Sequence, residues 1–166
     1  MTNVIALQRL TLRPVAHCDA AFLLDHYNDP EVRRFLFDGS TVAADQISQT
    51  IAESMHNFAT SGYGLWLIRK THDRAAVGTI GLRPLDDLGL EVFYSITPRY
   101  WGNGYATEAA CGIVDFALNR LGLKAVYAEV DKANTASAAV IERIGMTPFA
   151  TVAGVLGPMV RYRRTH

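Results

Sequence analysis

The sequence of 166 residues contains only two cysteines, and it has no excess of charge of either sign. Cys18 and Cys111 show neither metal-ligand spacing nor a disulfide pattern, so we expect reduced, buried thiols. The 16 basic residues balance 16 acidic residues. The overall charge therefore gives no argument for nucleic acid or an anionic membrane as a partner.

Long apolar runs are missing as well. Residues 1–12 are interrupted by Asn3, Gln8 and Arg9, which is unlike a secretory signal peptide, and no stretch approaches the length of a membrane span. The five histidines do not cluster, so we expect no metal site. These features predict a cytoplasmic protein, and the length fits a single domain over residues 1–166.

The order of the expected elements indicates an α+β fold. One strand and three helices come first, a meander of three strands follows, and two helices then alternate with three last strands. Ile47, Ile51, Met55 and Phe58 are expected to form the apolar stripe of the third helix. One strand–helix–strand unit is expected to be parallel. The strands are predicted at 8–13, 65–70, 76–83, 90–97, 124–130, 147–153 and 159–164, and the helices near 19, 30, 45, 105 and 134.

The most informative segment is a strand that leads through a glycine-rich loop into a helix. Gly102 and Gly104 lack side chains, so an anion can approach the backbone between them closely. Free N–H groups at the start of a helix bind phosphate, and the helix dipole assists them. Thr107, in the first turn, adds a hydroxyl donor. Two glycines alone are equally well explained by a tight turn.

A dinucleotide site is the competing interpretation, because Gly102-x-Gly104 resembles the opening of its fingerprint. Thr107, however, stands where the third glycine is expected, and only about sixty residues remain for further β–α–β repeats. Glu129 or Asp131 can mimic the ribose-binding acid of such a site, so this alternative is disfavoured but stays open.

The pattern Arg99-x-x-Gly102-x-Gly104-x-Ala106 resembles the acyl-CoA pyrophosphate loop of the GNAT superfamily of N-acetyltransferases. The wider match is similar to the Rim-type branch, which includes ribosomal-protein N-terminal acetyltransferases. This similarity covers nearly the whole chain. The matching segments are residues 10–14, 28–32, 100–109 and the closing motif at 134–146.

The resemblance implies a mostly antiparallel sheet of about seven strands, with splayed fourth and fifth strands and helices on both faces. It implies acetyl-CoA as cosubstrate and no metal. The pantetheine arm would pair with the fourth strand, the pyrophosphate would sit on the loop, and the closing motif would lie near the thioester. The implied cofactor-binding residues are Tyr94, Ser95, Ile96, Arg99, Gly102, Asn103, Gly104, Tyr105, Ala106, Thr107, Asn134 and Ser137.

Direct acetyl transfer needs an uncharged amine, a polarised carbonyl and a stabilised thiolate. Glu91 is the candidate base, because burial in its apolar strand would raise its pKa; the alternative is a solvent-facing glutamate beside the Gly89 turn. Ser137 is the candidate for stabilising the thiolate, because Ile141 occupies the position where many superfamily members have a tyrosine. For Ser137 and Asn134, the alternative role is satisfying backbone groups at the helix start.

The expected function is transfer of acetyl from acetyl-CoA directly to a primary amine, through a ternary complex. The acceptor is a protein N-terminus or a small-molecule amine, enclosed by the first helices near Phe35–Asp38 and the last hairpin near Val155–Pro158. A non-catalytic acyl-CoA-binding or sensor protein is the alternative. The resemblance also implies that a homodimer is common for this fold.

Overall fold

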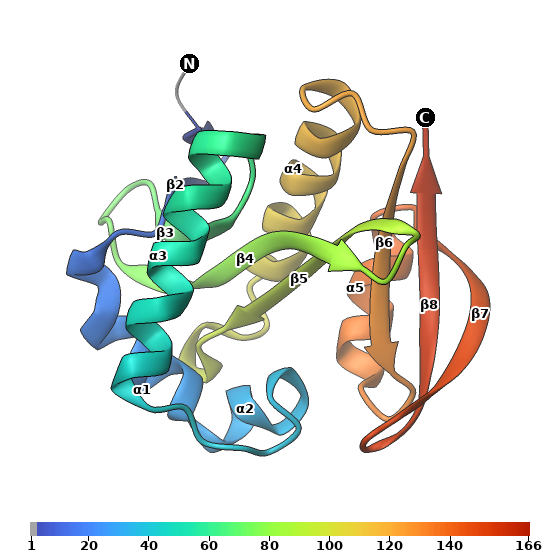
Figure 1. The fold of residues 1–166 in the computed structure, drawn as a ribbon, viewed down its shortest axis with the longest axis horizontal. Coiled ribbons are helices and arrows are strands. Elements are labelled where there is room, and N and C mark those ends of the chain that lie inside the picture. Colours follow the sequence, from blue (N-terminus) through green and yellow to red (C-terminus); the bar gives the residue numbers. More distant parts are fainter. Residues whose placement is uncertain (1–2) are drawn as a thin grey trace.

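The computed structural model describes residues 3–166, which form five α-helices and one eight-stranded sheet (Figure 1). The helices are α1 (Ala20–Asn28), α2 (Pro30–Leu36), α3 (Ala44–Ser61), α4 (Tyr105–Asn119) and α5 (Thr135–Arg143). The strands are β1 (Ile5–Ala6), β2 (Leu10–Pro14), β3 (Leu65–Lys70), β4 (Ala76–Leu85), β5 (Gly89–Ile96), β6 (Ala125–Asp131), β7 (Thr147–Gly154) and β8 (Gly157–Thr165).

The strand order is β1-β2-β3-β4-β5-β6-β8-β7, and every neighbouring pair is antiparallel except β5 and β6. The predicted α+β fold with a mostly antiparallel sheet is therefore confirmed, as is the parallel unit β5–α4–β6. The eighth strand is β1, whose two residues are too few to leave an alternating pattern in the sequence.

Strands β5 and β6 separate almost as soon as they meet. Their recorded register consists of a single pair, Glu91 with Tyr127, whereas β5 pairs with β4 along its whole length. Figure 1 shows the two strands diverging beyond this point. Because β1 precedes the first predicted strand, β5 and β6 are the fourth and fifth strands of the prediction. Beyond Glu91, the edge of β5 has no paired strand on the side of β6, and we call this separation of the two strands the splay.

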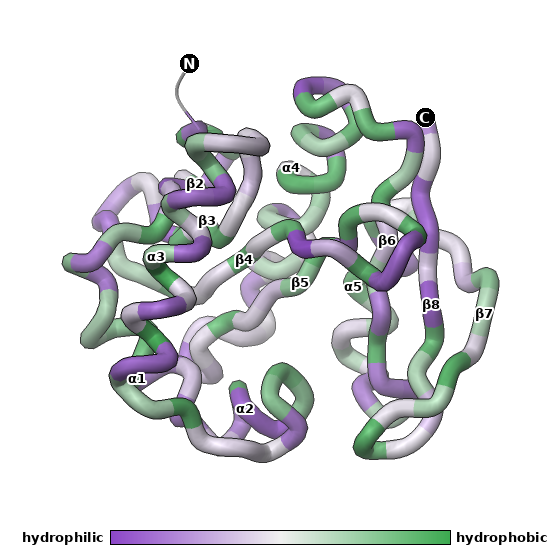
Figure 2. The backbone as a smooth tube through the Cα atoms, in the orientation of Figure 1, coloured by the Kyte–Doolittle hydropathy of each residue, from purple (hydrophilic) through white to green (hydrophobic). Residues whose placement is uncertain are grey.

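Helices cover both faces of the sheet. On one face, Ile47 and Ile51 of α3 belong to a buried cluster with Leu65 and Leu67 of β3, and α1 and α2 contribute to the same cluster. On the other face, α4 and α5 pack against the sheet in a second, larger cluster. Figure 2 shows α4 as mostly hydrophobic, whereas α3 alternates between hydrophobic and hydrophilic residues. We refer to these as the α1–α3 face and the α4–α5 face.

The predicted stripe of α3 was wrong at one position. Met55 is 45% exposed, and the neighbouring Ser54 is buried instead. The Ser54 hydroxyl accepts a hydrogen bond from the Leu65 N–H at 2.8 Å, which satisfies a backbone donor at the start of β3. A polar residue therefore takes an inward position because a neighbouring strand needs its oxygen, a requirement that helical periodicity does not reveal.

Candidate active site

The cofactor loop, residues 99–107, presents a row of unpaired backbone donors. Gly102 and Gly104 adopt φ of 77° and 75°, a left-handed conformation that glycine tolerates without strain. Within residues 3–166, the N–H groups of residues 102–107 have no backbone acceptor, because the first bond of α4 runs from Glu108 to the Gly104 carbonyl. The loop and the first turn of α4 therefore offer an anion-binding surface.

Arg9 holds the carbonyl side of this loop. Its Nη1 donates to the Asn103 carbonyl at 2.8 Å, and its Nε donates to the Glu108 carboxylate at 2.7 Å. The guanidinium also lies 4.9 Å from the centre of the Tyr105 ring. These contacts leave the N–H side of the loop free. Arg9 carries no signal in the sequence, because its partners lie more than ninety positions along the chain.

A second arginine reaches the loop from α5. Arg143 Nη1 donates to Thr107 Oγ1 at 3.3 Å, which places a cation beside the first turn of α4. Arg99, which the motif singled out, is exposed and donates from Nη2 to the Tyr100 hydroxyl at 2.9 Å. Arg143 belongs to the closing motif, but the sequence indicates no role for it. Its place at the end of a helix that approaches the loop depends on the tertiary fold.

The edge of β5 exposes backbone groups to the splay. Thr97 N–H donates to the Val77 carbonyl at 2.8 Å, and alternation along an antiparallel pair then turns the N–H and C=O of Tyr94 and Ile96 away from β4. The Ile96 carbonyl accepts from the Trp101 indole at 2.8 Å. Ser95 has the opposite orientation, because its backbone groups pair with β4.

Tyr94 meets Ser137 on the α4–α5 face. The two hydroxyl oxygens lie 2.8 Å apart, and burial raises the pKa of Tyr94 to about 12. The Ser137 N–H donates to Asn134 Oδ1 at 3.2 Å, so Asn134 caps α5. The structure thus brings together a phenol from β5 and a hydroxyl from the start of α5. The spacing of 43 residues between them gave the sequence no signal.

Glu91 is buried on the α1–α3 face, with 5% of its surface exposed, so the solvent-facing alternative is wrong. Its pairing with Arg83 across β4 and β5 brings Arg83 Nε to 2.7 Å from the carboxylate. Burial raises the pKa of Glu91, and the Arg83 charge opposes that rise. The carboxylate is thus desolvated but keeps one cationic partner.

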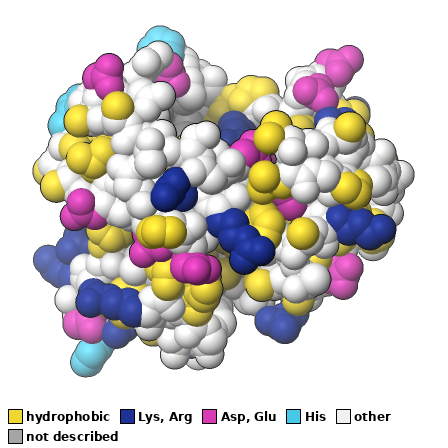
Figure 3. Space-filling view, turned by 90° about the horizontal axis from the view of Figure 1, so that it is seen from below, with side chains coloured by type: hydrophobic (Ala, Val, Ile, Leu, Met, Phe, Trp, Pro, Cys, Tyr) yellow, Lys and Arg dark blue, Asp and Glu magenta, His cyan; other side chains and the backbone are white. Residues whose placement is uncertain are grey.

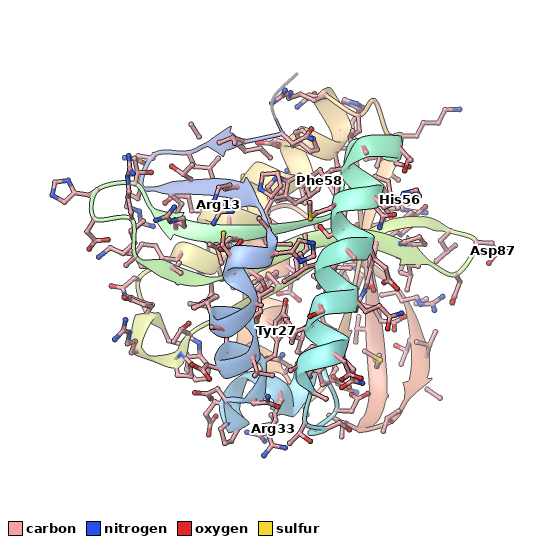
Figure 4. The ribbon with its side chains drawn as sticks, turned by 60° about the vertical axis from the view of Figure 1, so that its left-hand side comes forward. Arg13, Tyr27, Arg33, His56, Phe58 and Asp87 are labelled. Atoms are coloured by element: carbon pink, nitrogen blue, oxygen red, sulfur yellow. The ribbon has the colours of Figure 1, made fainter. Side chains whose placement is uncertain are left out.

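A buried polar network lies behind β5 on the same face. His26 Nε2 is 2.8 Å from Ser95 Oγ, which is 3.3 Å from Thr79 Oγ1. Thr79 in turn is 2.9 Å from the Tyr27 hydroxyl, and Figure 4 shows the Tyr27 side chain between α1 and α3. His26 Nδ1 also lies 3.2 Å from Thr97 Oγ1. The network fixes α1 against the strand that borders the splay.

Acid is expected to destabilise the protein through His26. Burial lowers the pKa of His26 from 6.5 to about 4, so below pH 6.5 the unfolded chain binds a proton that the folded chain excludes. Asp29 opposes this shift only in part. Linkage then predicts a loss of about 2 kcal/mol between pH 7 and pH 5. Urea denaturation of the wild type and His26→Gln measures it: the variant should lack this component, and identical pH dependence in both proteins would contradict it.

Comparison with known proteins decides the family. Residues 9–147 match the family model of the acetyltransferase (GNAT) domain. The chain belongs to this family. The resemblance found in the sequence is therefore confirmed at the level of the family, and the dinucleotide alternative is set aside.

Three relatives show how far the similarity extends. FsC-acetyl coenzyme A-N(2)-transacetylase of Aspergillus fumigatus is 32% identical over 86% of this chain and 64% of that protein. The crystal structure of an acetyltransferase from Agrobacterium tumefaciens is 26% identical, with a TM-score of 0.85, covering 98% of this chain and 94% of the other. RimL, a ribosomal L7/L12 acetyltransferase solved with coenzyme A, has a TM-score of 0.84 at 12% identity over 98% and 97% of the two chains, which shows a shared fold alone.

Family membership and these relatives identify this GNAT protein as an acyl-CoA-dependent acetyltransferase. In the part of the chain that the structure describes, no three His, Cys, Asp or Glu residues are placed to hold a metal ion. No helix among residues 3–166 has the length and apolar character needed to span a bilayer.

Proposed function

We propose that this GNAT protein transfers acetyl from acetyl-CoA directly to a primary amine within a ternary complex, and that it belongs to the Rim-type branch. The observation that carries the proposal is the row of unpaired N–H groups at residues 102–107, beside the free edge of β5. The name of the A. fumigatus relative, an acetyl coenzyme A transacetylase acting at a nitrogen, supports the same cosubstrate and acceptor class.

The chain offers separate groups for each part of the cosubstrate. The N–H groups of residues 102–107 would bind the diphosphate, and Arg143 and Arg99 would add positive charge beside it. The backbone groups of Tyr94 and Ile96 would pair with the pantetheine amides along the edge of β5. Acetyl-CoA supplies the thioester carbonyl and a thiolate leaving group.

Side chains carry out the proton transfer and stabilise the leaving thiolate. Glu91 accepts one proton from the ammonium of the acceptor, directly or through a water, and later releases it to solvent. The amine nitrogen forms a bond to the carbonyl carbon, the carbon–sulfur bond breaks, and the second proton of the nitrogen ends on the thiolate. Ser137, aligned by Tyr94, donates a hydrogen bond to the sulfur as its charge develops. The products are an acetamide and coenzyme A.

The decisive test is release of the coenzyme A thiol from acetyl-CoA in the presence of primary amines, followed with a thiol reagent. Turnover with any amine supports a transferase. A rise in melting temperature with acetyl-CoA, together with no thiol release across protein N-terminal peptides and small amines, would favour the sensor alternative instead.

Gly104→Ala tests the cofactor loop. A side chain at φ of 75° is strained, and its Cβ would lie 3.3 Å from Arg9 Nη2, so the Arg9 guanidinium that holds the loop must move by a few tenths of an ångström. We expect the KM for acetyl-CoA to rise by about tenfold, from about 1.4 kcal/mol of lost binding energy. Gly122→Ala is the matched control, because its φ of 69° carries similar strain and a Cβ there meets nothing within 4 Å. An unchanged KM in Gly104→Ala, or an equal rise in both variants, would contradict this role.

A further inference from the structure

A group of acidic residues lies on the α1–α3 face in addition to Glu91. Val126, Ala128 and Val130 of β6 belong to the buried cluster of the α4–α5 face, so the alternating residues Glu129 and Asp131 lie on the opposite face. Asp38, in the connection between α2 and α3, is close enough for its charge to act on Asp131. We call Asp38, Glu129 and Asp131 the carboxylate cluster.

Asp131 is the buried member of this cluster. Only 5% of its surface is exposed, and its Oδ1 is buried without any hydrogen bond in the described residues. Burial raises the pKa of Asp131, and the carboxylates of Asp38 and Glu129 raise it further. A buried oxygen without a donor is costly, so the site is arranged for a donor that residues 3–166 do not supply.

Arg161, a cationic side chain that reaches the cluster, is already engaged. Arg161 Nε bonds Glu129 at 2.7 Å, and its Nη2 bonds Asp86 at 2.6 Å. No ion pair within residues 3–166 neutralises Asp131 or Asp38. The cluster therefore keeps excess negative charge on the side of the sheet that carries Glu91.

The cluster also lies at the end of the splay that carries the acetyl-transfer groups. Asp131 ends β6, and its carbonyl accepts from the Asn134 N–H at 2.8 Å. Asn134 in turn caps α5 through the N–H of Ser137 at 3.2 Å. The unpaired carboxylate of Asp131 and the hydroxyl of Ser137 thus lie at the two ends of the connection from β6 to the first turn of α5. Figure 3, seen from below, shows basic, acidic and hydrophobic side chains interspersed across the middle of this end of the molecule.

We propose that the carboxylate cluster binds a second ammonium group of the acceptor, so that aliphatic diamines and longer polyamines are the preferred substrates. The inference rests on the proposed function, because it assigns an acceptor to the same site. An organic ammonium suits the cluster better than a metal ion, since no three acidic, histidine or cysteine side chains in residues 3–166 are placed to ligate one.

In this arrangement the two ammonium groups of a diamine have different roles. One ammonium loses its proton to Glu91 and attacks the thioester, while the other keeps its charge and donates to Asp131 Oδ1. A monoamine of equal length would place a methyl group against a buried carboxylate and leave it unpaired. A site built around a charged hydrogen bond rejects such an analogue strongly, so we expect a preference of about thirtyfold in kcat/KM.

The experiment compares 1,4-diaminobutane with n-pentylamine, two molecules with the same number of heavy atoms, in the thiol-release assay. In the wild type, kcat/KM should be about thirtyfold higher for the diamine. Asp131→Asn should reduce this ratio to about threefold or less, mainly through KM for the diamine. Asp38→Asn, at an exposed position where asparagine tolerates the φ of 52°, should reduce it in part without a risk to folding.

Asp87→Asn is the matched control. Asp87 is an exposed acid at the tip of the β4–β5 hairpin (Figure 4), so the same change of charge there should leave the ratio as in the wild type. Equal kcat/KM for both amines in the wild type, or an unchanged ratio in both Asp131→Asn and Asp38→Asn, overturns the inference while the transferase stands. If peptides are acetylated and neither small amine is, the inference is likewise wrong. Absence of thiol release with every amine overturns the proposed function itself.

Discussion

Glu91→Gln is expected to lower kcat with a primary amine by about a hundredfold, while the KM for acetyl-CoA stays near the wild-type value. The amide keeps the size of the side chain and can accept a hydrogen bond from Arg83, but it cannot take a proton from an ammonium. Since Glu91 is buried and next to Arg83, the variant isolates the proton transfer from the packing. Steady-state kinetics of thiol release measure both constants.

The pH dependence of the wild type is expected to follow the same carboxylate. Only ionised Glu91 accepts a proton, so kcat/KM should fall as pH decreases through its raised pKa. Arg83 lowers that pKa by its charge and its hydrogen bond; Arg83→Met should therefore move the acidic limb to higher pH. In Glu91→Gln this limb should be absent.

The control for Glu91 is Glu53→Gln, the same change at an exposed position on α3. It should leave kcat and the acidic limb as in the wild type. A wild-type rate in Glu91→Gln, or an acidic limb that persists there unchanged, would remove Glu91 from the mechanism. The buried Asp131 would then be the carboxylate to examine for the same task.

Local patterns predicted the elements well where one short segment contains the whole signal. The alternating strands, the glycine loop before α4 and the proline at the start of α2 each depend on neighbours in sequence, and all are present in the structure. Whether Glu91 is buried depends instead on its pairing with Arg83 and on the helices that cover that face. For this reason the sequence alone leaves both orientations of Glu91 open.

The contacts around the candidate site that the sequence did not reveal all join residues that lie far apart in the chain. Arg9 meets the cofactor loop, His26 meets Ser95 and Tyr94 meets Ser137 only after the sheet has formed. Asp131 was considered only as the acid of a dinucleotide site. Its Oδ1 is unpaired because no donor in the described residues reaches it, and a sequence motif cannot show that.

The hydroxyls of Tyr94 and Ser137 are expected to act as one unit on the leaving thiolate. Ser137→Ala should lower kcat by about thirtyfold, because the sulfur loses the donor that stabilises its charge. Tyr94→Phe should lower kcat by about tenfold, because it removes the bond of 2.8 Å that orients the serine. With a pKa of about 12, the phenol keeps its proton at neutral pH and can donate to Ser137 Oγ, which frees the serine proton for the sulfur.

The double variant, Tyr94→Phe with Ser137→Ala, shows whether Tyr94 acts through Ser137 or independently of it. If Tyr94 works through Ser137, the double variant should be about as slow as Ser137→Ala alone, whereas independent contributions would multiply to about three-hundredfold. Tyr63→Phe, in the connection between α3 and β3, removes a phenol hydroxyl elsewhere and should leave kcat unchanged. Multiplying losses would give Tyr94 its own contact with the reacting groups, and undiminished kcat in Ser137→Ala would exclude the pair from protonating or stabilising the thiolate.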